Sequence, residues 1–330
     1  MSAILSQSIM LKKIEKELES FKKKLFYSGK KHKQLEKIQN KLENMPYEIY
    51  DKIINNSFSV QIPKIKSIEE TLDKIINDKC SISRFGDGEF ACMNYSRISF
   101  HDPSEDLAER LKEVLSSDLP NLLIGLPDCF GSLDNYVPSV IDFWRKWMSQ
   151  KREMVYSYLD MNRVYYNAFL TKVYMPFNKT DEHYKNCSEY FKKIKKIWKN
   201  RDVILFEGQE ARLGVANDLL DGAKSISRII FCPDKNAFNK YDQILSAFDE
   251  VNSDALILAA LGPTATVLAY DLCKKGYQAV DIGYISEEYE CFLRKETPLE
   301  LKSMGRNSKM KHASNPDDPE YKKQIIRKIV

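Results

Sequence analysis

Cysteine and histidine are scarce in this 330-residue chain, and neither is clustered. The seven cysteines form no C-x-x-C pair, and no two of the four histidines lie near one another in the sequence. A scattered, odd number of cysteines is typical of reduced thiols and argues against a disulfide framework or a cysteine-based zinc site. The few histidines argue against a zinc site built on imidazole. We therefore expect a cytoplasmic protein.

Long apolar runs and a strong excess of one charge are lacking as well. No stretch approaches the roughly 20 apolar residues that a membrane-spanning helix needs, and the N-terminus has no signal-peptide pattern. The net charge of +4 gives no reason to expect a nucleic-acid partner. Neither G-x-S-x-G nor H-E-x-x-H occurs, so the usual signatures of serine hydrolases and zinc proteases are missing.

Residues 1–45 have the spacing of two short helices, with apolar residues every three or four positions and a break at residues 27–29. We predict a helical hairpin, which forms an appendage over residues 1–60, and a main domain over residues 61–330. The hairpin combines an apolar seam with many lysines, which leaves two functions open. It could associate with itself through the seam, or its lysines could make peripheral contact with the inner face of an anionic membrane. Lysines on a helix exterior are usually solvated, so we favour the first.

From residue 64 onward, short apolar runs alternate with helical patterns. Such alternation predicts an α/β domain with a mostly parallel, Rossmann-like sheet that helices cover on both faces. Ligands of such sheets bind beyond the carboxyl ends of the strands, where the distinctive loops of this chain fall. The predicted strands are 81–84, 121–126, 202–206, 228–232, 254–261 and 278–282, and the predicted helices include 68–77, 102–117, 165–174, 213–221 and 266–275.

A short acidic segment, RFGDGEF at residues 84–90, follows the first of these strands. Gly86 lets the backbone turn and approach a ligand closely. Asp87 and Glu89 would project the same way from an extended or turning segment. Two carboxylates beside Arg84 suit a hard divalent cation, Mn²⁺ or Mg²⁺, that holds a diphosphate. The alternative is a tight acidic turn closed by an Arg84–Asp87 ion pair.

Two further loops also follow predicted strands. Gly262-Pro263-Thr264 precedes a helix, where free backbone N–H groups and the helix dipole favour an anion, although a plain helix cap is the alternative. This loop has neither Rossmann glycine spacing nor a P-loop lysine, so a dehydrogenase or P-loop kinase is not supported. Glu207 and Arg212 mark the other loop, from which Arg212 would reach a phosphate. An ordinary surface ion pair is its alternative.

The last predicted strand leads into an acidic segment, DIGYISEEYE at residues 281–290. Glu288 and Glu290 are candidates for a general base that takes a proton from an acceptor hydroxyl, although most acidic runs are simply solvated. The chain shows paired carboxylates and loops suited to phosphate, but no evident protein nucleophile. We therefore expect transfer from an activated, phosphate-bearing donor.

Taken together and in order, the motifs at residues 84–90, 203–242, 261–272 and 276–290 resemble the bacterial glycosyltransferases with the GT-D fold. The resemblance covers roughly residues 64–330. It implies a domain for a nucleotide-diphospho-sugar, with UDP-glucose or a related donor as precedent, and a D-x-E motif, here Asp87-Gly88-Glu89, acting with manganese or magnesium. This chain has Tyr284 where the family usually has histidine, and a neutral phenol is not an equivalent metal ligand.

The sequence therefore predicts a hexosyltransferase that moves a sugar from a nucleotide donor to a glycan, glycopeptide or lipid-linked acceptor. Asp87 and Glu89 would hold the cation, and Glu288 or Glu290 would act as base. A non-catalytic nucleotide-binding or scaffold subunit of a glycan-assembly complex is the rival, and Tyr284 keeps it open. The residues expected around the donor are Arg84, Gly86, Glu207, Arg212, Gly262, Pro263, Thr264 and Tyr284.

Overall fold

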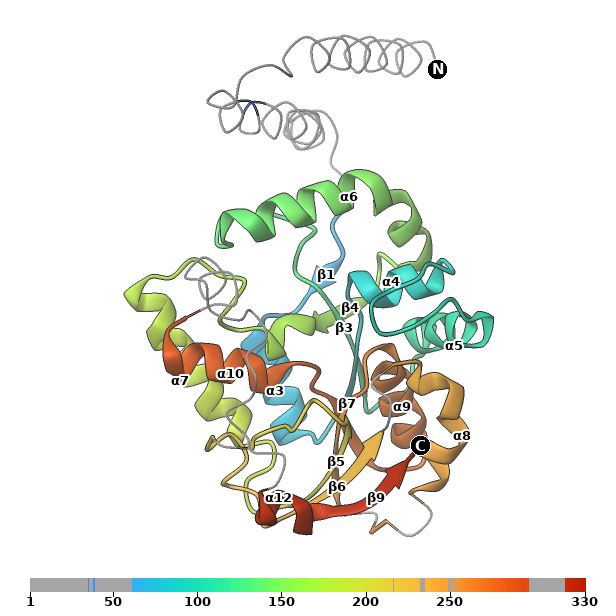
Figure 1. Ribbon diagram of the computed structural model, residues 1–330. Coiled ribbons are helices and arrows are strands. Elements are labelled where there is room, and N and C mark those ends of the chain that lie inside the picture. The colour runs from blue at the N-terminus through green and yellow to red at the C-terminus, as the bar shows by residue number, and fades with distance from the viewer. Residues whose placement is uncertain are drawn as a thin grey trace. The chain divides into compact units, whose positions relative to one another are not determined.

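The computed structural model describes residues 61–330 except 216, 232–234, 249–250, 253 and 297–317, and it also describes Leu35 and Ile38 (Figure 1). From residue 61 onward, the described residues belong to one compact unit, Val60–Val330. Apart from Leu35 and Ile38, the predicted hairpin, with its proposed self-association and membrane contact, lies outside the described residues. Within the described part, no helix has both the length and the apolar character needed to cross a membrane.

Nine strands of the described residues form one sheet, in the order β1-β4-β3-β2-β8-β7-β5-β6-β9, and every pair is parallel. The predicted parallel α/β architecture is confirmed. The strand bounds are β1 Lys64–Ile65, β2 Ser81–Arg84, β3 Leu122–Leu126, β4 Val164–Asn167, β5 Asp202–Gly208, β6 Ser225–Phe231, β7 Leu256–Ala260, β8 Gln278–Asp281 and β9 Ile325–Ile329.

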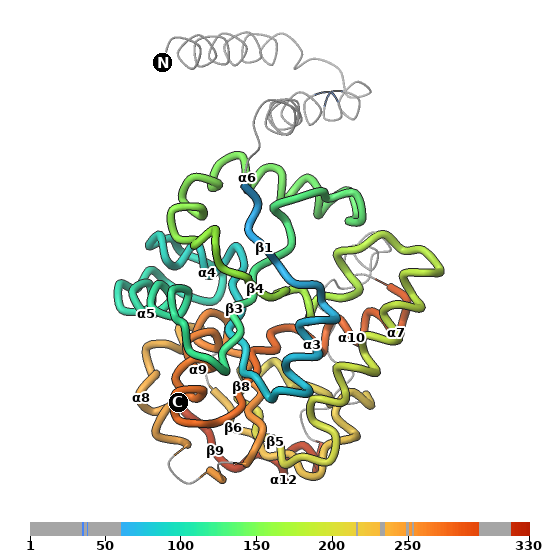
Figure 2. Tube along the Cα trace, turned by 180° about the vertical axis from the view of Figure 1, so that it is seen from behind, coloured from blue at the N-terminus to red at the C-terminus, as the bar shows by residue number. Residues whose placement is uncertain are grey.

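Helices cover both faces of this sheet. Figures 1 and 2, seen from opposite sides, place α4, α5, α8 and α9 on one face and α3, α7 and α10 on the other. The helix bounds are α3 Ile68–Asn77, α4 Asp87–Met93, α5 Glu105–Ser116, α6 Pro138–Tyr158, α7 Asp181–Lys195, α8 Tyr241–Ser246, α9 Pro263–Lys274, α10 Ile285–Arg294 and α12 Pro319–Gln324, with short 3₁₀ turns η1 Ala168–Thr171 and η2 Ala237–Lys240.

The central strands are apolar throughout because both of their faces are buried. On β5, Leu205 belongs to one hydrophobic core, while Ile204 and Phe206 belong to the core on the opposite face. On β7, Leu258 belongs to the same core as Leu205, and Ile257 belongs to the core on the opposite face. Side chains that alternate between faces in this way fix the register of each strand, since a slip of one residue would exchange the two sets.

The path of the chain reverses between β2 and β8. After β2 it enters α4, on the face where α9 packs against β2 and β8. After β8 it enters α10, which packs against α7 on the other face. In open α/β sheets, ligands bind at such a switch point, beyond the carboxyl ends of the strands. The only register pair that joins β2 to β8 in the described sheet is Ile82 with Val280.

Two predicted helices are wrong. In the segment predicted as helix 165–174, residues 164–167 form β4 instead: the backbone pairs with β3, the side chains alternate in burial, and a 3₁₀ turn follows. The described residues of the predicted helix 213–221, which are 213–215 and 217–221, form turns and bends. There Gly214 has a φ of +66°, and the Asn217 side chain accepts a hydrogen bond from Leu219 N, a local bond that competes with the helical ladder.

Candidate functional site at the β2–β8 junction

Arg84, the last residue of β2, hydrogen-bonds inside the protein to Asp281, the last residue of the neighbouring strand β8. We call this contact the Arg84–Asp281 clasp. Arg84 Nε donates to the Asp281 carbonyl oxygen and its Nη2 donates to Asp281 Oδ1, each at 2.7 Å. Nη1 donates to Thr171 Oγ1, also at 2.7 Å. The Arg84 side chain is only 13% exposed. The alternative interpretation, an Arg84–Asp87 ion pair, is therefore wrong, because Arg84 pairs with a carboxylate 197 residues away.

Asp281 is the member of this site that sequence reasoning missed. It ends β8, is 4% exposed, and also accepts a hydrogen bond from Gly283 N at 3.2 Å. Burial raises the pKa of Asp281, while Arg84 opposes that rise. Gly283 has a φ of +44°, and a Cβ at this position would collide with Arg84 Nη2. A glycine two residues after an acidic strand end was the available signal for this arrangement.

Asp87 and Glu89 lie in the first turn of α4 and not in an extended segment. Residues two apart on a helix do not face the same way, so the geometric reason given for pairing them does not hold. Glu89 Oε2 instead accepts a hydrogen bond from Gly86 N at 2.7 Å, which closes the start of the helix. Burial and the nearby Asp281 carboxylate raise the pKa of Glu89 to about 7.

These carboxylates fit a divalent cation only in part. Among the described residues, no three side chains of the metal-binding types gather as a metal site. Mg²⁺ is commonly bound through one or two carboxylates together with substrate phosphates and water. Glu89 supplies one carboxylate of this kind, and its repulsion with Asp281 would be relieved by a positive charge. Asp87 supplies a second from the same helical turn, although it does not face the same way. The residues therefore fit a cation that a phosphate-bearing ligand helps to hold.

The Gly262–Thr264 loop forms the N-terminus of α9, next to β8. Gly262 is the N-cap, with φ +56° and ψ −144°, and no side chain caps the helix. Pro263 occupies the first turn, where its missing N–H costs nothing. Thr264 is fully buried, and its Oγ1 has no hydrogen-bond partner among the described residues. A 12-residue helix that begins with uncapped N–H groups favours an anion at this end.

Thr266 fixes α9 to the end of β2. Its Oγ1 donates to the Arg84 carbonyl oxygen at 2.9 Å, and its carbonyl oxygen accepts from Ser83 Oγ at 2.7 Å. The helix N-terminus, the Arg84–Asp281 clasp and the start of α4 are therefore held at one edge of the sheet.

Glu207 and Arg212, expected beside the donor, occupy a different environment. Glu207 is fully buried, and its Oε1 forms an ion pair of 2.6 Å with Arg228 Nη1. Its Oε2 accepts from Leu213 N at 2.7 Å, and Arg228 Nη2 donates to the Leu213 carbonyl oxygen at 2.8 Å. Arg212 is half-buried, with a φ of +40°. As placed, Glu207 stabilises its loop and presents no surface to a ligand.

The two candidate bases also face the protein interior. Glu288 is fully buried, and its Oε2 accepts hydrogen bonds from Tyr174 N and Met175 N, each at 3.0 Å. Burial raises the pKa of Glu288 to about 7. Glu290 is 5% exposed and accepts from Asn217 Nδ2 at 3.4 Å. Neither carboxylate is accessible to an acceptor in this structure, so the base role of either remains an untested prediction.

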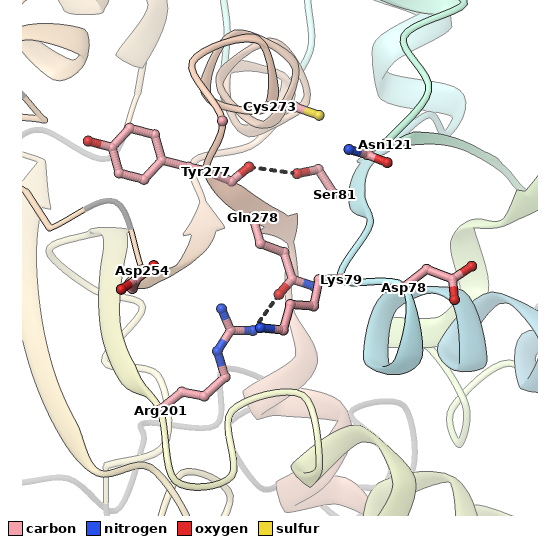
Figure 3. Close-up of a pocket in the computed structure, with 10 residues that line it drawn as sticks. Asp78, Lys79, Ser81, Asn121, Arg201, Asp254, Cys273, Tyr277 and Gln278 are labelled. Atoms are coloured by element: carbon pink, nitrogen blue, oxygen red, sulfur yellow. Dashed lines mark hydrogen bonds between the residues drawn. The ribbon is translucent and has the colours of Figure 1, made fainter.

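A cavity of about 250 Å³ lies at the opposite edge, where the strands begin (Figure 3). Arg201 and Gln278 point into it and are hydrogen-bonded to each other. The cavity is also lined by Asp78 and Gly276, which follow the C-terminal ends of α3 and α9. Helix C-termini carry partial negative charge and disfavour a phosphate. We therefore assign the candidate site to the carboxyl edge.

The fold defines an open, parallel α/β protein whose candidate ligand site lies at the switch point. Residues 82–307 match the family described as Glycosyltransferase GT-D fold, and the chain belongs to this family. The family resemblance inferred from the sequence motifs is confirmed.

Two curated relatives and two solved structures support this assignment. Over 276 residues the chain is 33% identical to Glycosyltransferase GlyD of Streptococcus pneumoniae serotype 4 (strain ATCC BAA-334 / TIGR4), which covers 82% of this chain and 33% of that protein. It is 34% identical over 271 residues to Probable glycosyl transferase Gly of Streptococcus gordonii, covering 80% of this chain and 39% of that protein. The chain thus spans well under half the length of either relative.

The solved structures match over nearly their whole length. One is described as the highly conserved domain of unknown function 1792 with a distinct glycosyltransferase fold; its TM-score is 0.71 at 32% identity, covering 82% of this chain and 97% of that chain. The other, a new glycosyltransferase from Streptococcus sanguinis, has a TM-score of 0.70 at 33% identity, covering 81% of this chain and 100% of that chain.

Proposed function

We propose that this chain transfers a sugar from a nucleotide-diphospho-sugar to a hydroxyl acceptor at the β2–β8 junction. The observation that carries the proposal is the placement of an acidic helix start and an uncapped helix N-terminus at one switch point. An anionic diphosphate is favoured by the α9 N-terminus, and a cation beside it is favoured by Asp87 and Glu89. The curated relatives named as glycosyltransferases support the same reaction class.

In the proposed mechanism, the N–H groups at the start of α9 bind a phosphate of the donor. Asp87 and Glu89 would hold Mn²⁺ or Mg²⁺, which supplies neutralisation of the charge that develops on the leaving diphosphate. Arg84 is a positioning residue, because it orients Asp281 and, through it, the backbone of Gly283. No side chain is assigned as the base, since Glu288 and Glu290 are buried.

The proposal extends to the donor and the acceptor of the reaction. We propose a UDP-hexose, such as UDP-glucose, as donor, and a glycan, glycopeptide or lipid-linked hydroxyl as acceptor. A non-catalytic nucleotide-binding subunit is the rival, and Tyr284, in place of the histidine usual in the family, is the feature that favours it. The rival predicts nucleotide binding without turnover.

The test is the substitution Asp87→Asn, which removes a charge while keeping the size of the side chain. UDP release from UDP-sugars in Mn²⁺ should fall by about a hundredfold or more, the scale for losing one preorganised electrostatic group. Asp106→Asn is the matched control, because Asp106 is an exposed aspartate in the first turn of α5. Both variants lose about 0.3–1 kcal/mol of helix-dipole stabilisation. If both retain full UDP release, the proposed site is wrong.

A further inference from the structure

Two aromatic side chains contact each other at the border of this site while remaining exposed to solvent. The ring centroids of Phe100 and Tyr284 lie 5.8 Å apart, with the ring planes inclined by 48°. Phe100 is 43% exposed and Tyr284 is 50% exposed. By contrast, Phe85 and Phe90, on neighbouring segments, are almost completely buried. We call Phe100 and Tyr284 the aromatic pair.

The aromatic pair borders the phosphate-suited end of the site. Tyr284 directly follows Gly283 and is the N-cap residue of α10. Phe100 lies in the segment between α4 and α5, and a Cβ added to Gly262 would lie 3.7 Å from Phe100 Cβ. Because Gly262 begins α9, a ligand whose phosphate sits at that helix start would place neighbouring groups near the pair.

The segment that carries Phe100 is firmly held. The Phe100 carbonyl oxygen accepts from Asn236 N at 2.8 Å. Asp102 N donates to Asn236 Oδ1 at 2.7 Å, and Asn236 Nδ2 donates to Asp102 Oδ2 at 2.9 Å. His101, between them, is 4% exposed. The exposed Phe100 ring thus projects from a fixed backbone, and a preorganised surface of this kind loses little entropy when it binds a ligand.

We infer that the aromatic pair binds the nucleobase of the donor by stacking, an inference that rests on the proposed function. The face of a neutral aromatic ring carries no positive charge to attract a phosphate, whereas every nucleobase has a flat π-face that stacks on aromatic side chains. The transferred sugar is attached at the diphosphate end, where Asp87 and Glu89 lie. The base is at the other end of the nucleotide, so a stacking surface beside the α9 start is placed to meet it.

The experiment measures binding of UDP, CDP, GDP, dTDP, ADP and inorganic pyrophosphate to the full chain by titration calorimetry in Mg²⁺. For the nucleotide that binds wild type most tightly, Phe100→Ala and Tyr284→Ala should each raise Kd by about 5-fold to 150-fold, the range for losing one aromatic–base stack. The Kd for pyrophosphate should stay within about twofold, because pyrophosphate has no base to stack. Tyr284→Phe keeps the ring and should bind the nucleotide like wild type.

Phe143→Ala is the matched control, because Phe143 is 46% exposed on α6 and packs against Trp144 rather than Tyr284. It should leave both affinities unchanged. If Phe100→Ala and Tyr284→Ala weaken pyrophosphate and nucleotide binding equally, or bind the nucleotide like wild type, the stacking inference alone is overturned. A wild-type chain that binds none of the nucleotides would overturn the proposed function together with it.

Discussion

The buried ion pair between Glu207 and Arg228 gives a prediction that separates a structural role from a binding role. Glu207 was expected at the donor site, yet the structure places it with Arg228 at 2.6 Å, with exposures of 0% and 2%. Glu207→Ala would leave a buried guanidinium without its carboxylate, and would also remove the acceptor of Leu213 N. Breaking a buried ion pair by removing one partner costs about 3–5 kcal/mol.

A loss of this size is a large part of the roughly 5–15 kcal/mol that stabilises a folded domain. At about 2–4 °C per kcal/mol for domains of 150–250 residues, we expect Tm to fall by at least about 6 °C. Differential scanning fluorimetry measures this change, and titration calorimetry with UDP on the same sample measures binding. Asp202→Ala is the control, because the Asp202–Lys224 pair is exposed and its loss should change Tm little.

The double variant Glu207→Met with Arg228→Met sharpens the test. Replacing both members of a buried pair by apolar side chains is often neutral, so the double variant should be more stable than Glu207→Ala. A Glu207→Ala protein with an unchanged Tm and lost UDP binding would refute this reasoning and return Glu207 to the donor site.

Two further predictions concern other buried contacts. Gly283→Ala should lower Tm by more than Gly276→Ala does, because both positions have a positive φ but only a Cβ at Gly283 collides with Arg84; equal losses by fluorimetry would show that the clasp tolerates the side chain. Because burial raises the pKa of Glu288 to about 7 from 4.5, its contribution to stability is largest below pH 4.5 and declines as the pH rises to 7. Urea unfolding at pH 5 and pH 8 should therefore show a smaller pH dependence in Glu288→Gln, by roughly 3 kcal/mol, and an unchanged dependence would contradict the prediction.

The central sheet could be predicted because its strands are short, continuous apolar runs bounded by turn residues. β5 and β7 are of this kind, with 202–206 and 254–261 expected as strands. The outer strands gave weaker signals. β9 exposes its three middle residues, and β4 has the aromatic pattern Val-Tyr-Tyr-Asn, which short-range periodicity does not separate from helix.

The site could be predicted in its location but not in its contacts. Residues 84–90 and the start of α9 do meet at the switch point, because they follow β2 and β7, the two strands that flank β8, and Thr266 Oγ1 donates to the Arg84 carbonyl oxygen. Local sequence does not distinguish a strand-end carboxylate that faces a ligand from one that is paired with an arginine. Glu207 pairs with Arg228 and Arg84 pairs with Asp281, and such partners, 21 and 197 residues apart, are chosen by the tertiary fold.

The pairing of β2 with β8 has a consequence for how the chain folds during its synthesis. β8 is the strand that joins β1–β4 to β5, β6, β7 and β9, and it is the eighth to be synthesised of the nine strands that the structure describes. Most of the polypeptide must therefore leave the ribosome before Arg84 meets Asp281. Contacts of such long sequence separation form slowly, because loop closure must be completed first. A nascent chain interrupted before residue 278 would hold both acidic residues of α4 and the helix start of α9, yet lack the strand that brings them together. Synthesis through β8 is thus a precondition for the site itself, and not only for overall stability.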